Sequence, residues 1–347
     1  MELMKVMMTL QSSKYLHLAR TRCFNSNLGA TLIARYRCAP SIGWSYQESR
    51  HNLTTSATHD SGVQNTESIS IEGTKLGVIG YGKMSGALVG GFLNAGILST
   101  KDICASVRSQ ERKAQLIDMG LEHVFDDALH GGAESIADAS NVIMLGVKPQ
   151  VIKPVLHALA PHLKPKHLVV SIAAGITLAE LEESLGHGVR VIRVMPNTPS
   201  LCQQGASAYA LGAYAGEKDS AIVHELLSKV GVAIKVQEKM MDGVTGVSGS
   251  GPAYIYMMIE AMADGGVMAG LPRETAMILA AQTAKGAAEM VLNGEGQGLI
   301  HPGVLKDQVA SPAGATIAAI AALEDAGMRS AFIKAVLASA KRSEELG

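Results

Sequence analysis

The sequence predicts an α/β domain with a mainly parallel sheet, followed by an all-α domain, and two observations carry this prediction. From Lys75 to about Val236, short apolar runs alternate with helical patterns, which is typical of a parallel sheet covered by helices on both faces. After about Val236 the strand signals stop, and the rest of the chain reads as helices rich in Ala, Met and Gly. A chain of 347 residues has room for both domains.

The α/β domain is expected to open with a strand at 76–79, a tight glycine turn and a helix at 84–95. Further strands are predicted at 103–107, 142–145, 168–171 and 190–194, with helices at 111–119, 151–163 and 178–185. In the second domain, helices are predicted at 254–269, 273–292, 309–326 and 329–346. Gly270 followed by Pro272 marks a helix stop and a helix start between the first two.

Residues 1–73 are expected to be a leader outside the fold, ahead of the domains at 74–236 and 237–347. Up to Gln47 the only acidic residue is Glu2, while six residues are basic and Ser and Thr recur. This composition is typical of an organellar transit peptide, for a mitochondrion or a plastid. The alternative is a merely disordered tail, in which case a cytoplasmic location is expected.

Composition excludes several classes of protein. A formal net charge of −1 and a pI of about 6.8 argue against a nucleic-acid binder. No run approaches the roughly 18 continuous apolar residues that a membrane span needs, so no membrane association is expected. The four cysteines give neither a disulfide framework nor a metal-ligand spacing, so no metal site is predicted. The eleven histidines are scattered, and His167 among them is expected at the surface or a helix end.

A dinucleotide site is predicted at the first strand–helix junction, where the chain reads Gly80-Tyr81-Gly82-Lys83-Met84-Ser85. The first glycine permits the tight turn, the second lets the backbone approach a pyrophosphate, and the third small residue permits close helix–strand packing. The start of the following helix offers free N–H groups and a positive dipole end to phosphates. The alternative is a glycine-rich turn with no ligand.

The end of the second strand indicates which dinucleotide binds. An NAD site would place an acidic residue here for the ribose 2′-hydroxyl, whereas this chain has Ser106, Arg108 and Ser109. Because a guanidinium pairs with phosphate in a charge-assisted fork, NADPH is expected, with NADH a weaker substitute. The alternative is that Arg108 is an ordinary surface charge. Small residues after the strands at 142–145 and 168–171 would leave space for a nicotinamide-ribose.

Several segments resemble the pyrroline-5-carboxylate reductase family, most closely its plant branch. The resemblance runs from about Lys75 to the C-terminus and rests on the segments at 147–149, 193–199, 246–254, 263–267, 270–273, 301–307, 311–317 and 340–343. It implies a Rossmann domain followed by a helical dimerisation domain, in members that often form larger rings of dimers. It also implies an oxidoreductase acting on a cyclic imine, which transfers hydride from NADPH to the C=N bond of 1-pyrroline-5-carboxylate and so makes L-proline in the last step of proline biosynthesis.

The same resemblance assigns site residues. Those implied for the cofactor are Ile79, Gly80, Tyr81, Gly82, Lys83, Met84, Ser106, Arg108, Ser109, Val147, Lys148, Pro149, Ala173, Ala174 and Gln308. Gly314, Ala315 and Thr316 would bind the substrate carboxylate, with Ser311 and Thr245 lining the catalytic pocket and Glu238 near the proline site. Three departures stand out: Ala313 replaces the first glycine of the family's usual pair, Gln308 stands where many members have Asn or Asp, and the stretch 294–300 is a few residues longer than usual.

The expected reaction needs an anion cradle, a hydride donor and a proton for nitrogen. The backbone of 311–317 and the Thr316 hydroxyl form a plausible carboxylate clamp, although Thr316 could instead be a plain helix N-cap. His301 is expected to be structural, and the proton donor is water or the substrate itself. A β-hydroxyacid dehydrogenase would need a Lys in the first inter-domain helix, which 251–272 lacks. A non-catalytic dinucleotide-sensing scaffold and a reductase of the six-membered homologue are further alternatives.

Overall fold

The computed structural model describes residues 71–292 and 299–346. The predicted leader therefore lies almost wholly outside the described residues, as does most of the stretch at 294–300. Within the described ranges, no helix is both long enough and apolar enough to cross a bilayer.

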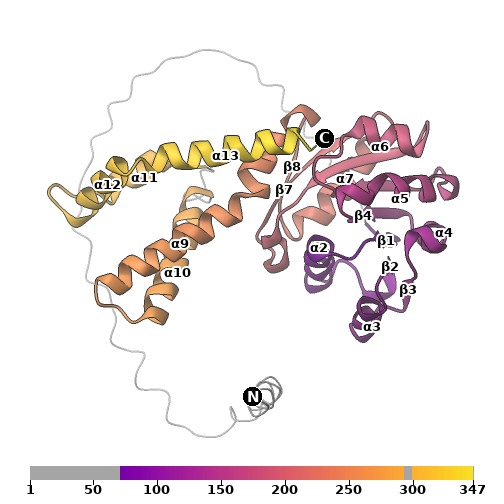
Figure 1. Cartoon of the computed structure of the whole chain (residues 1–347), viewed down its shortest axis with the longest axis horizontal. Helices are drawn as coiled ribbons and strands as arrows, with labels where there is room; N and C mark the ends of the chain where they lie inside the picture. The colour runs from indigo at the N-terminus through magenta and orange to yellow at the C-terminus, as the bar shows by residue number, and fades with distance from the viewer. Residues whose placement is uncertain (1–70, 293–298, 347) are drawn as a thin grey trace, which may run out of the picture. The chain divides into compact units, whose positions relative to one another are not determined.

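A single eight-stranded sheet organises the first part of the chain, with the strand order β3-β2-β1-β4-β5-β6-β7-β8 (Figure 1). The strands are β1 (Leu76–Ile79), β2 (Ile103–Ser106), β3 (His123–Phe125), β4 (Val142–Leu145), β5 (Leu168–Ser171), β6 (Arg190–Met195), β7 (Gly205–Leu211) and β8 (Gly231–Lys235). All neighbours pair in parallel except β6 and β7, which run antiparallel. The order reverses between β1 and β4, and open α/β sheets bind their ligands at such a switch point.

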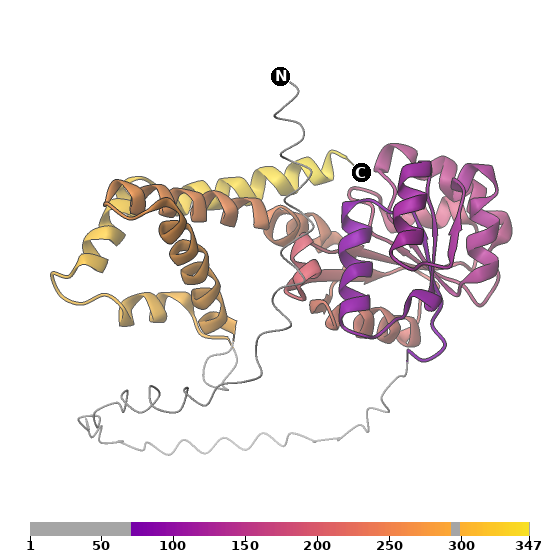
Figure 2. The same cartoon turned by 90° about the horizontal axis from the view of Figure 1, so that it is seen from below.

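Six helices cover the two faces of this sheet, so its central strands are buried on both sides (Figure 2). They are α2 (Lys83–Asn94), α3 (Gln110–Asp118), α4 (Gly132–Ala139), α5 (Ile152–Leu159), α6 (Leu178–Leu185) and α7 (Glu217–Ser228). Apolar residues of α2, α3 and α7 pack with one face of the strands, and those of α4, α5 and α6 pack with the other. Neighbouring residues on a strand face opposite sides, so Val78 belongs to the first core and Ile79 to the second.

The sequence prediction missed β3, β7, β8, α4 and α7, although all the strands lie before about Val236, where the strand signals were expected to stop. β3 has only three residues and is partly exposed, and β8 is half-exposed at the edge of the sheet, so neither carries a continuous apolar run. The predicted helix at 151–163 also ends early, at Leu159, where a short 3₁₀ turn begins. Ala160 keeps helical geometry, with φ −50° and ψ −45°, but Pro161 has no N–H to continue the α-helical hydrogen bonds.

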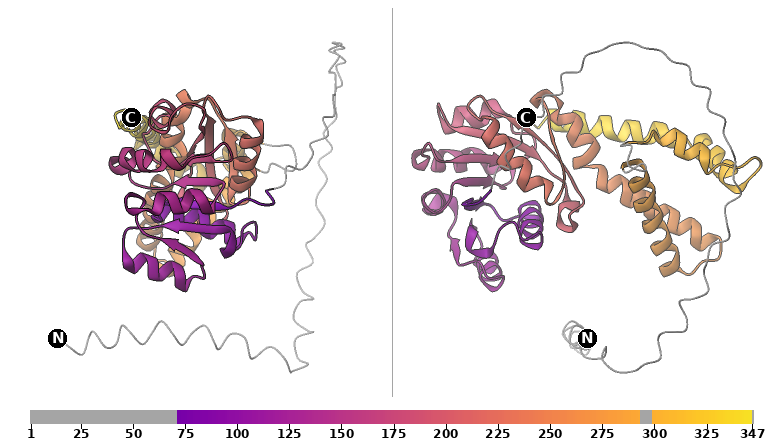
Figure 3. Two further views of the ribbon diagram at one scale, coloured as in Figure 1. Left: turned by 90° about the vertical axis from the view of Figure 1, so that its right-hand side faces the viewer. Right: turned by 180° about the vertical axis from the view of Figure 1, so that it is seen from behind.

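Helices make up the second part of the chain (Figure 3). They are α8 (Met241–Val244), a π-helical turn (Thr245–Gly249), α9 (Gly251–Met268), α10 (Arg273–Leu292), α11 (Pro302–Gln308), α12 (Ala315–Asp325) and α13 (Met328–Glu344). α9 and α10 pack through Ala263, Ala276 and Ala280. The second half of α13 packs against α8 and the π-helical turn, where a Cβ on Gly246 would lie 2.6 Å from the carbonyl oxygen of Val336.

The predicted helix at 309–326 is wrong over its first six residues, because α12 begins only at Ala315. Pro312 cannot continue a helix from 309, since it lacks the N–H and its ring clashes with the preceding turn. Ala313 then takes a left-handed backbone conformation with a φ of 56°. The glycine that the resemblance implies at this position would adopt this conformation without a steric penalty.

His167 is buried, so its predicted surface position is wrong. The backbone N–H of Lys164 donates to His167 Nδ1 at 2.8 Å, which leaves the proton on Nε2, and Nε2 donates to the carbonyl of Ala137 at 2.8 Å. Burial lowers the pKa of the imidazole, because the charged form loses its solvation. The neutral ring thus joins the start of β5 to the end of α4.

We expect the stability of the protein to depend on pH through His167. A lowered pKa in the folded state means that neutral His167 contributes fully above the unfolded histidine pKa of about 6.5, and that the contribution is lost as the pH falls through the folded pKa. At pH 7.5 the free energy of unfolding of a His167→Gln variant should be about 1–3 kcal/mol lower than that of the wild type. Between pH 7.5 and 5, however, the free energy of unfolding should fall less in the variant than in the wild type. Urea unfolding across this range measures both. Exposed His157→Gln is the control, and an unchanged pH slope in His167→Gln would contradict the assignment.

We also expect Ala313→Gly to raise the free energy of unfolding by up to about 1 kcal/mol. The left-handed conformation costs an L-residue roughly 1–2 kcal/mol, and the extra entropy of unfolded glycine offsets part of that gain. Ala313→Val should instead lower stability, because a β-branched side chain fits a positive φ poorly. Urea midpoints at one fixed protein concentration measure the difference. If glycine and valine lower the free energy of unfolding equally, the left-handed backbone conformation of residue 313 does not determine the stability of this loop.

Candidate dinucleotide and substrate site

The turn after β1 is held in a conformation that only glycine can take. Gly80 has a φ of +88°, and a Cβ there would lie 2.6 Å from a side-chain carbon of Val147 and 2.9 Å from its backbone nitrogen. The N–H of Gly80 donates to Ser106 O at 3.1 Å, and the N–H of Gly146 donates to Ile79 O at 2.9 Å. The turn therefore sits between the exits of β2 and β4, at the switch point of the sheet.

The start of α2 is open to an anion. Its N-cap is Gly82, so no side chain caps the first turn. The buried Ser85 hydroxyl donates to Gly80 O at 2.8 Å and fixes the turn against the helix. The uncapped N–H groups and the positive helix end are therefore available to a phosphate.

A cavity of about 390 Å³ lies at this switch point, within the size range of small-molecule sites. Of the residues predicted for the cofactor, nine line it: Ile79, Gly80, Tyr81, Gly82, Ser106, Arg108, Ser109, Val147 and Lys148. Its lining lies wholly between Ile79 and Val155, so the structure does not bring Lys83, Met84, Pro149, Ala173, Ala174 or Gln308 to its wall. Lys83 and Met84 belong to the first turn of α2, and Gln308 is the exposed last residue of α11.

The groups at the β2 exit differ in what they can offer a ligand. Ser106 is buried and its hydroxyl donates to Asp126 O at 2.6 Å, so its proton is already engaged. Ser109 caps α3, accepting from the N–H of Arg112 at 3.1 Å, and keeps its own hydroxyl proton. Arg112 also lines the cavity. The sequence prediction missed Arg112, although its place in the first turn of the helix after Arg108 could have indicated it.

The phenol of Tyr81 stays neutral at physiological pH. Its hydroxyl is buried with no hydrogen-bond partner among the described residues. Burial raises the pKa of Tyr81 to about 12, and the nearby charge of Arg112 opposes this shift only in part. An unpaired polar atom beside the glycine turn fits a site that is completed by a bound molecule.

Glu238 links the sheet to the helical region. Its Oε1 accepts from the backbone N–H of Leu178 at 2.6 Å and from Arg193 Nη1 at 3.1 Å. Leu178 begins α6, after the loop that contains Ala173 and Ala174. The carboxylate predicted to lie near substrate therefore holds the loop after β5, and its own charge is paired with an almost fully buried guanidinium.

Thr245 starts the π-helical turn, an element that often marks functional sites. Its hydroxyl donates to Met241 O at 2.9 Å and lies 3.4 Å from the Ser343 hydroxyl of α13. The side chain is half-buried, and its proton is engaged by the backbone.

The predicted carboxylate loop lies at the start of α12. Gly314 is the N-cap, so the reading of Thr316 as a plain N-cap is wrong, and no side chain caps this helix. The Gly314 N–H donates to Ser311 O at 3.1 Å and closes the turn. Ser311, Ala315 and Thr316 are exposed. His301 caps the preceding helix α11, with Nδ1 accepting from Gly303 N–H at 3.1 Å, which fits its expected structural role.

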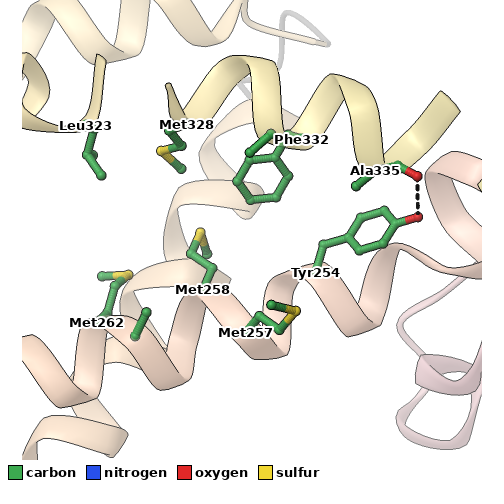
Figure 4. A pocket seen from close by; sticks show the side chains of 10 residues that line it. Tyr254, Met257, Met258, Met262, Leu323, Met328, Phe332 and Ala335 are labelled. Atoms are coloured by element: carbon green, nitrogen blue, oxygen red, sulfur yellow. Dashed lines mark hydrogen bonds between the residues drawn. The ribbon is translucent and has the colours of Figure 1, made fainter. Parts of the chain in front are cut away.

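A second cavity, of about 730 Å³, is an apolar groove between α9, the end of α12 and α13 (Figure 4). Tyr254 points across it and donates its hydroxyl proton to Ala335 O at 3.3 Å. The groove is lined by Tyr254, Met257, Met258, Ala261, Met262, Leu323, Met328, Ala331, Phe332 and Ala335. Met257 is 71% exposed and Met268, at the end of α9, is 90% exposed. An apolar surface of this extent is typical of a protein–protein interface.

Comparison with known proteins agrees with both parts of the chain. The family model described as pyrroline-5-carboxylate reductase dimerisation matches residues 238–346, so the helical region mediates self-association. The model described as NADP oxidoreductase coenzyme F420-dependent matches residues 75–175. The predicted Rossmann domain with a following all-α dimerisation domain is thereby confirmed.

Relatives cover almost all of the described chain. A pyrroline-5-carboxylate reductase of Arabidopsis thaliana is 46% identical over 278 residues, which are 80% of this chain and 97% of that protein. One from Methanosarcina acetivorans is 45% identical, over 80% of this chain and 99% of its own length. The crystal structure of Plasmodium falciparum pyrroline carboxylate reductase with NADP bound superposes with a TM-score of 0.71 at 31% identity, covering 80% of this chain and 99% of that one. The chain belongs to the pyrroline-5-carboxylate reductase family.

Proposed function

We propose that this protein is a pyrroline-5-carboxylate reductase, which transfers hydride from NADPH to the C=N bond of 1-pyrroline-5-carboxylate and releases L-proline in the last step of proline biosynthesis. The observation that carries the proposal is the glycine turn at the switch point of the sheet, in a chain of this family. The turn opens into a cavity whose β2 side carries arginines.

The residues at the switch point fit an NADPH molecule. The uncapped first turn of α2, approached over Gly82, would hold the pyrophosphate, and Arg108 would hold the 2′-phosphate. Val147 and Lys148 lie at the β4 exit and would position the nicotinamide end. Bound NADPH supplies the hydride, and the chain supplies orientation and charge.

The loop before α12 would hold the substrate. The Gly314 N–H is engaged by Ser311 O, so Gly314 shapes the turn. The Ala315 N–H lies at an uncapped helix start, and the Thr316 hydroxyl makes no hydrogen bond to any described residue. These donors form the proposed clamp for the carboxylate of the ring. Ser311 and Thr245 would line the pocket, with Glu238 near it.

The main contribution of the chain to the proposed reaction is to position the substrate and the cofactor. A protonated imine is already electrophilic, so holding its carbon against the hydride donor supplies much of the rate. The hydroxyl of Thr245 already donates to a backbone carbonyl, which leaves it better suited to accept than to donate. We infer that water or the iminium itself carries the proton.

Self-association would complete the site. The lining of the nucleotide cavity ends at Val155, whereas the carboxylate loop belongs to the region that mediates self-association. The loop of one copy can thus meet the cavity of its partner, with the apolar groove of Figure 4 filled by the partner's helices. We propose a dimer of this kind, with rings of dimers as the larger assembly.

The division of the chain at 236/237 and the leader are further parts of the proposal. The single sheet ends at Lys235, immediately before the proposed boundary. The acid-poor composition of the first 47 residues supports an organellar destination, in a mitochondrion or a plastid.

We expect the purified full-length protein to oxidise NADPH when 1-pyrroline-5-carboxylate is added, and to form L-proline in equal amount. Absorbance at the NADPH band, together with amino-acid analysis of the product, measures this. A panel of β-hydroxyacids with NADP⁺, the six-membered imine homologue and a sample without imine are the comparisons. Turnover of a hydroxyacid with no turnover of either imine would overturn the proposal.

We expect Thr316→Val to lower kcat/KM for the imine roughly tenfold or more, mostly through KM, because a hydrogen bond to a charged partner contributes about 1.5–3 kcal/mol. Thr316→Ser keeps the hydroxyl and should restore most of the activity. The KM for NADPH should not change in either variant. Wild-type kinetics in Thr316→Val would remove the hydroxyl from the carboxylate clamp.

A further inference from the structure

Two guanidinium groups line the β2 side of the nucleotide cavity. Arg108 lies in the loop after β2, and Arg112 is the third residue of α3. Ser109, between them, accepts the N–H of Arg112 at 3.1 Å, so a capped turn fixes the backbone that carries both arginines. Side chains that start this close on a fixed turn and share one cavity wall can reach a common ligand.

Neither guanidinium is neutralised by a carboxylate among the described residues. Arg112 Nη1 donates to the neutral side chain of Gln115 at 3.0 Å. Lys113, the next residue, is different, because its Nζ lies 2.8 Å from Asp126. Arg112, which lines the cavity, therefore has no carboxylate partner among the described residues, whereas Lys113, which does not line it, has one.

The position of Arg112 also connects two parts of the cavity. Its charge acts on the phenol of Tyr81, which belongs to the glycine turn. Arg112, the glycine turn proposed for the pyrophosphate and the loop proposed for the ribose therefore line one cavity. The adenosine ribose of a dinucleotide bridges these two places.

Other groups at the β2 exit are less available to an anion. The Ser106 hydroxyl proton is engaged by Asp126 O. Asp127, which follows β3 and also lines the cavity, offers only acceptor oxygens, one of which accepts the N–H of Leu129 at 3.0 Å. The donors that remain are Arg108, Arg112 and the Ser109 hydroxyl. A phosphate monoester carries close to two negative charges near neutral pH, and two planar guanidinium forks match that charge and its oxygens.

We propose that Arg112 is a second specificity-determining residue, which together with Arg108 clamps the adenosine 2′-phosphate of NADPH. This inference rests on the cofactor part of the proposed function. It assigns the preference for NADPH to a pair of arginines on one capped turn, and Ser109 serves both as the cap and as a third donor.

Calorimetric titration with adenosine 2′,5′-bisphosphate and with 5′-AMP tests the clamp without turnover. Arg112→Ala should weaken binding of the bisphosphate roughly tenfold or more, and leave 5′-AMP unchanged, as should Arg108→Ala. Arg112→Lys keeps the charge but loses the guanidinium fork, so its affinity for the bisphosphate should lie between those of the wild type and Arg112→Ala. Lys113→Ala removes the same charge one residue away and should bind both nucleotides like the wild type.

Steady-state kinetics add a second measurement. Arg112→Ala should raise the KM for NADPH and leave the KM for NADH unchanged. An unchanged affinity for the bisphosphate, or an equal loss for both nucleotides, would overturn the role of Arg112. If the wild type binds the bisphosphate through Arg112 but reduces no imine, the proposed reaction is wrong and the proposed role of Arg112 is unaffected.

Discussion

The close approach of three strand exits at Gly80 is the constraint on which the nucleotide site depends. The left-handed turn there passes so near Val147 that a single added carbon would force β1 and β4 apart. The same approach lets Ser106 and Ile79 accept backbone hydrogen bonds from the neighbouring exits. It leaves the start of α2 uncapped and pointing into the cavity. The proposed anion site is thus formed by the close packing of these strand exits.

The helical region follows a different design. Its helices pack closely through alanine and glycine, and much of its apolar surface is left exposed in one chain. In water that surface is unfavourable, and burying it between copies is what stabilises an assembly. The proposed carboxylate loop is carried by this same region and is itself exposed. In the proposed dimer, assembly and substrate binding would be coupled, because the interface that covers the groove would also decide what the loop faces.

Sequence patterns predicted the central strands because these strands are buried on both faces and therefore appear as continuous apolar runs. They predicted the glycine turn because its Gly-x-Gly-x-x-small spacing is typical of a dinucleotide-binding turn. The patterns failed at β3 and β8, whose residues are partly exposed, and at the start of α12, where Pro312 and Ala313 break the helix. The burial of His167 is a tertiary effect, because its partners come from α4 and from the loop before β5. Arg112 was missed although its place in the first turn of the helix after Arg108 was a local signal, and the cavity adds that both side chains line one wall.

The loop after β5 shows how the two regions could act on each other. On one side Glu238, from the start of the helical region, holds the first N–H of α6 and the buried Arg193. On the other side, Leu346, which follows the C-cap of α13, packs against Gly175, where a Cβ would lie 3.0 Å from the leucine Cβ. The loop that contains Ala173 and Ala174 is therefore fixed by residues from both ends of the helical region. A Cβ on Gly175 would also lie 3.2 Å from the backbone carbonyl of Leu346, and with a φ of +78° this position favours glycine, so the contact between the loop and the end of the chain depends on it.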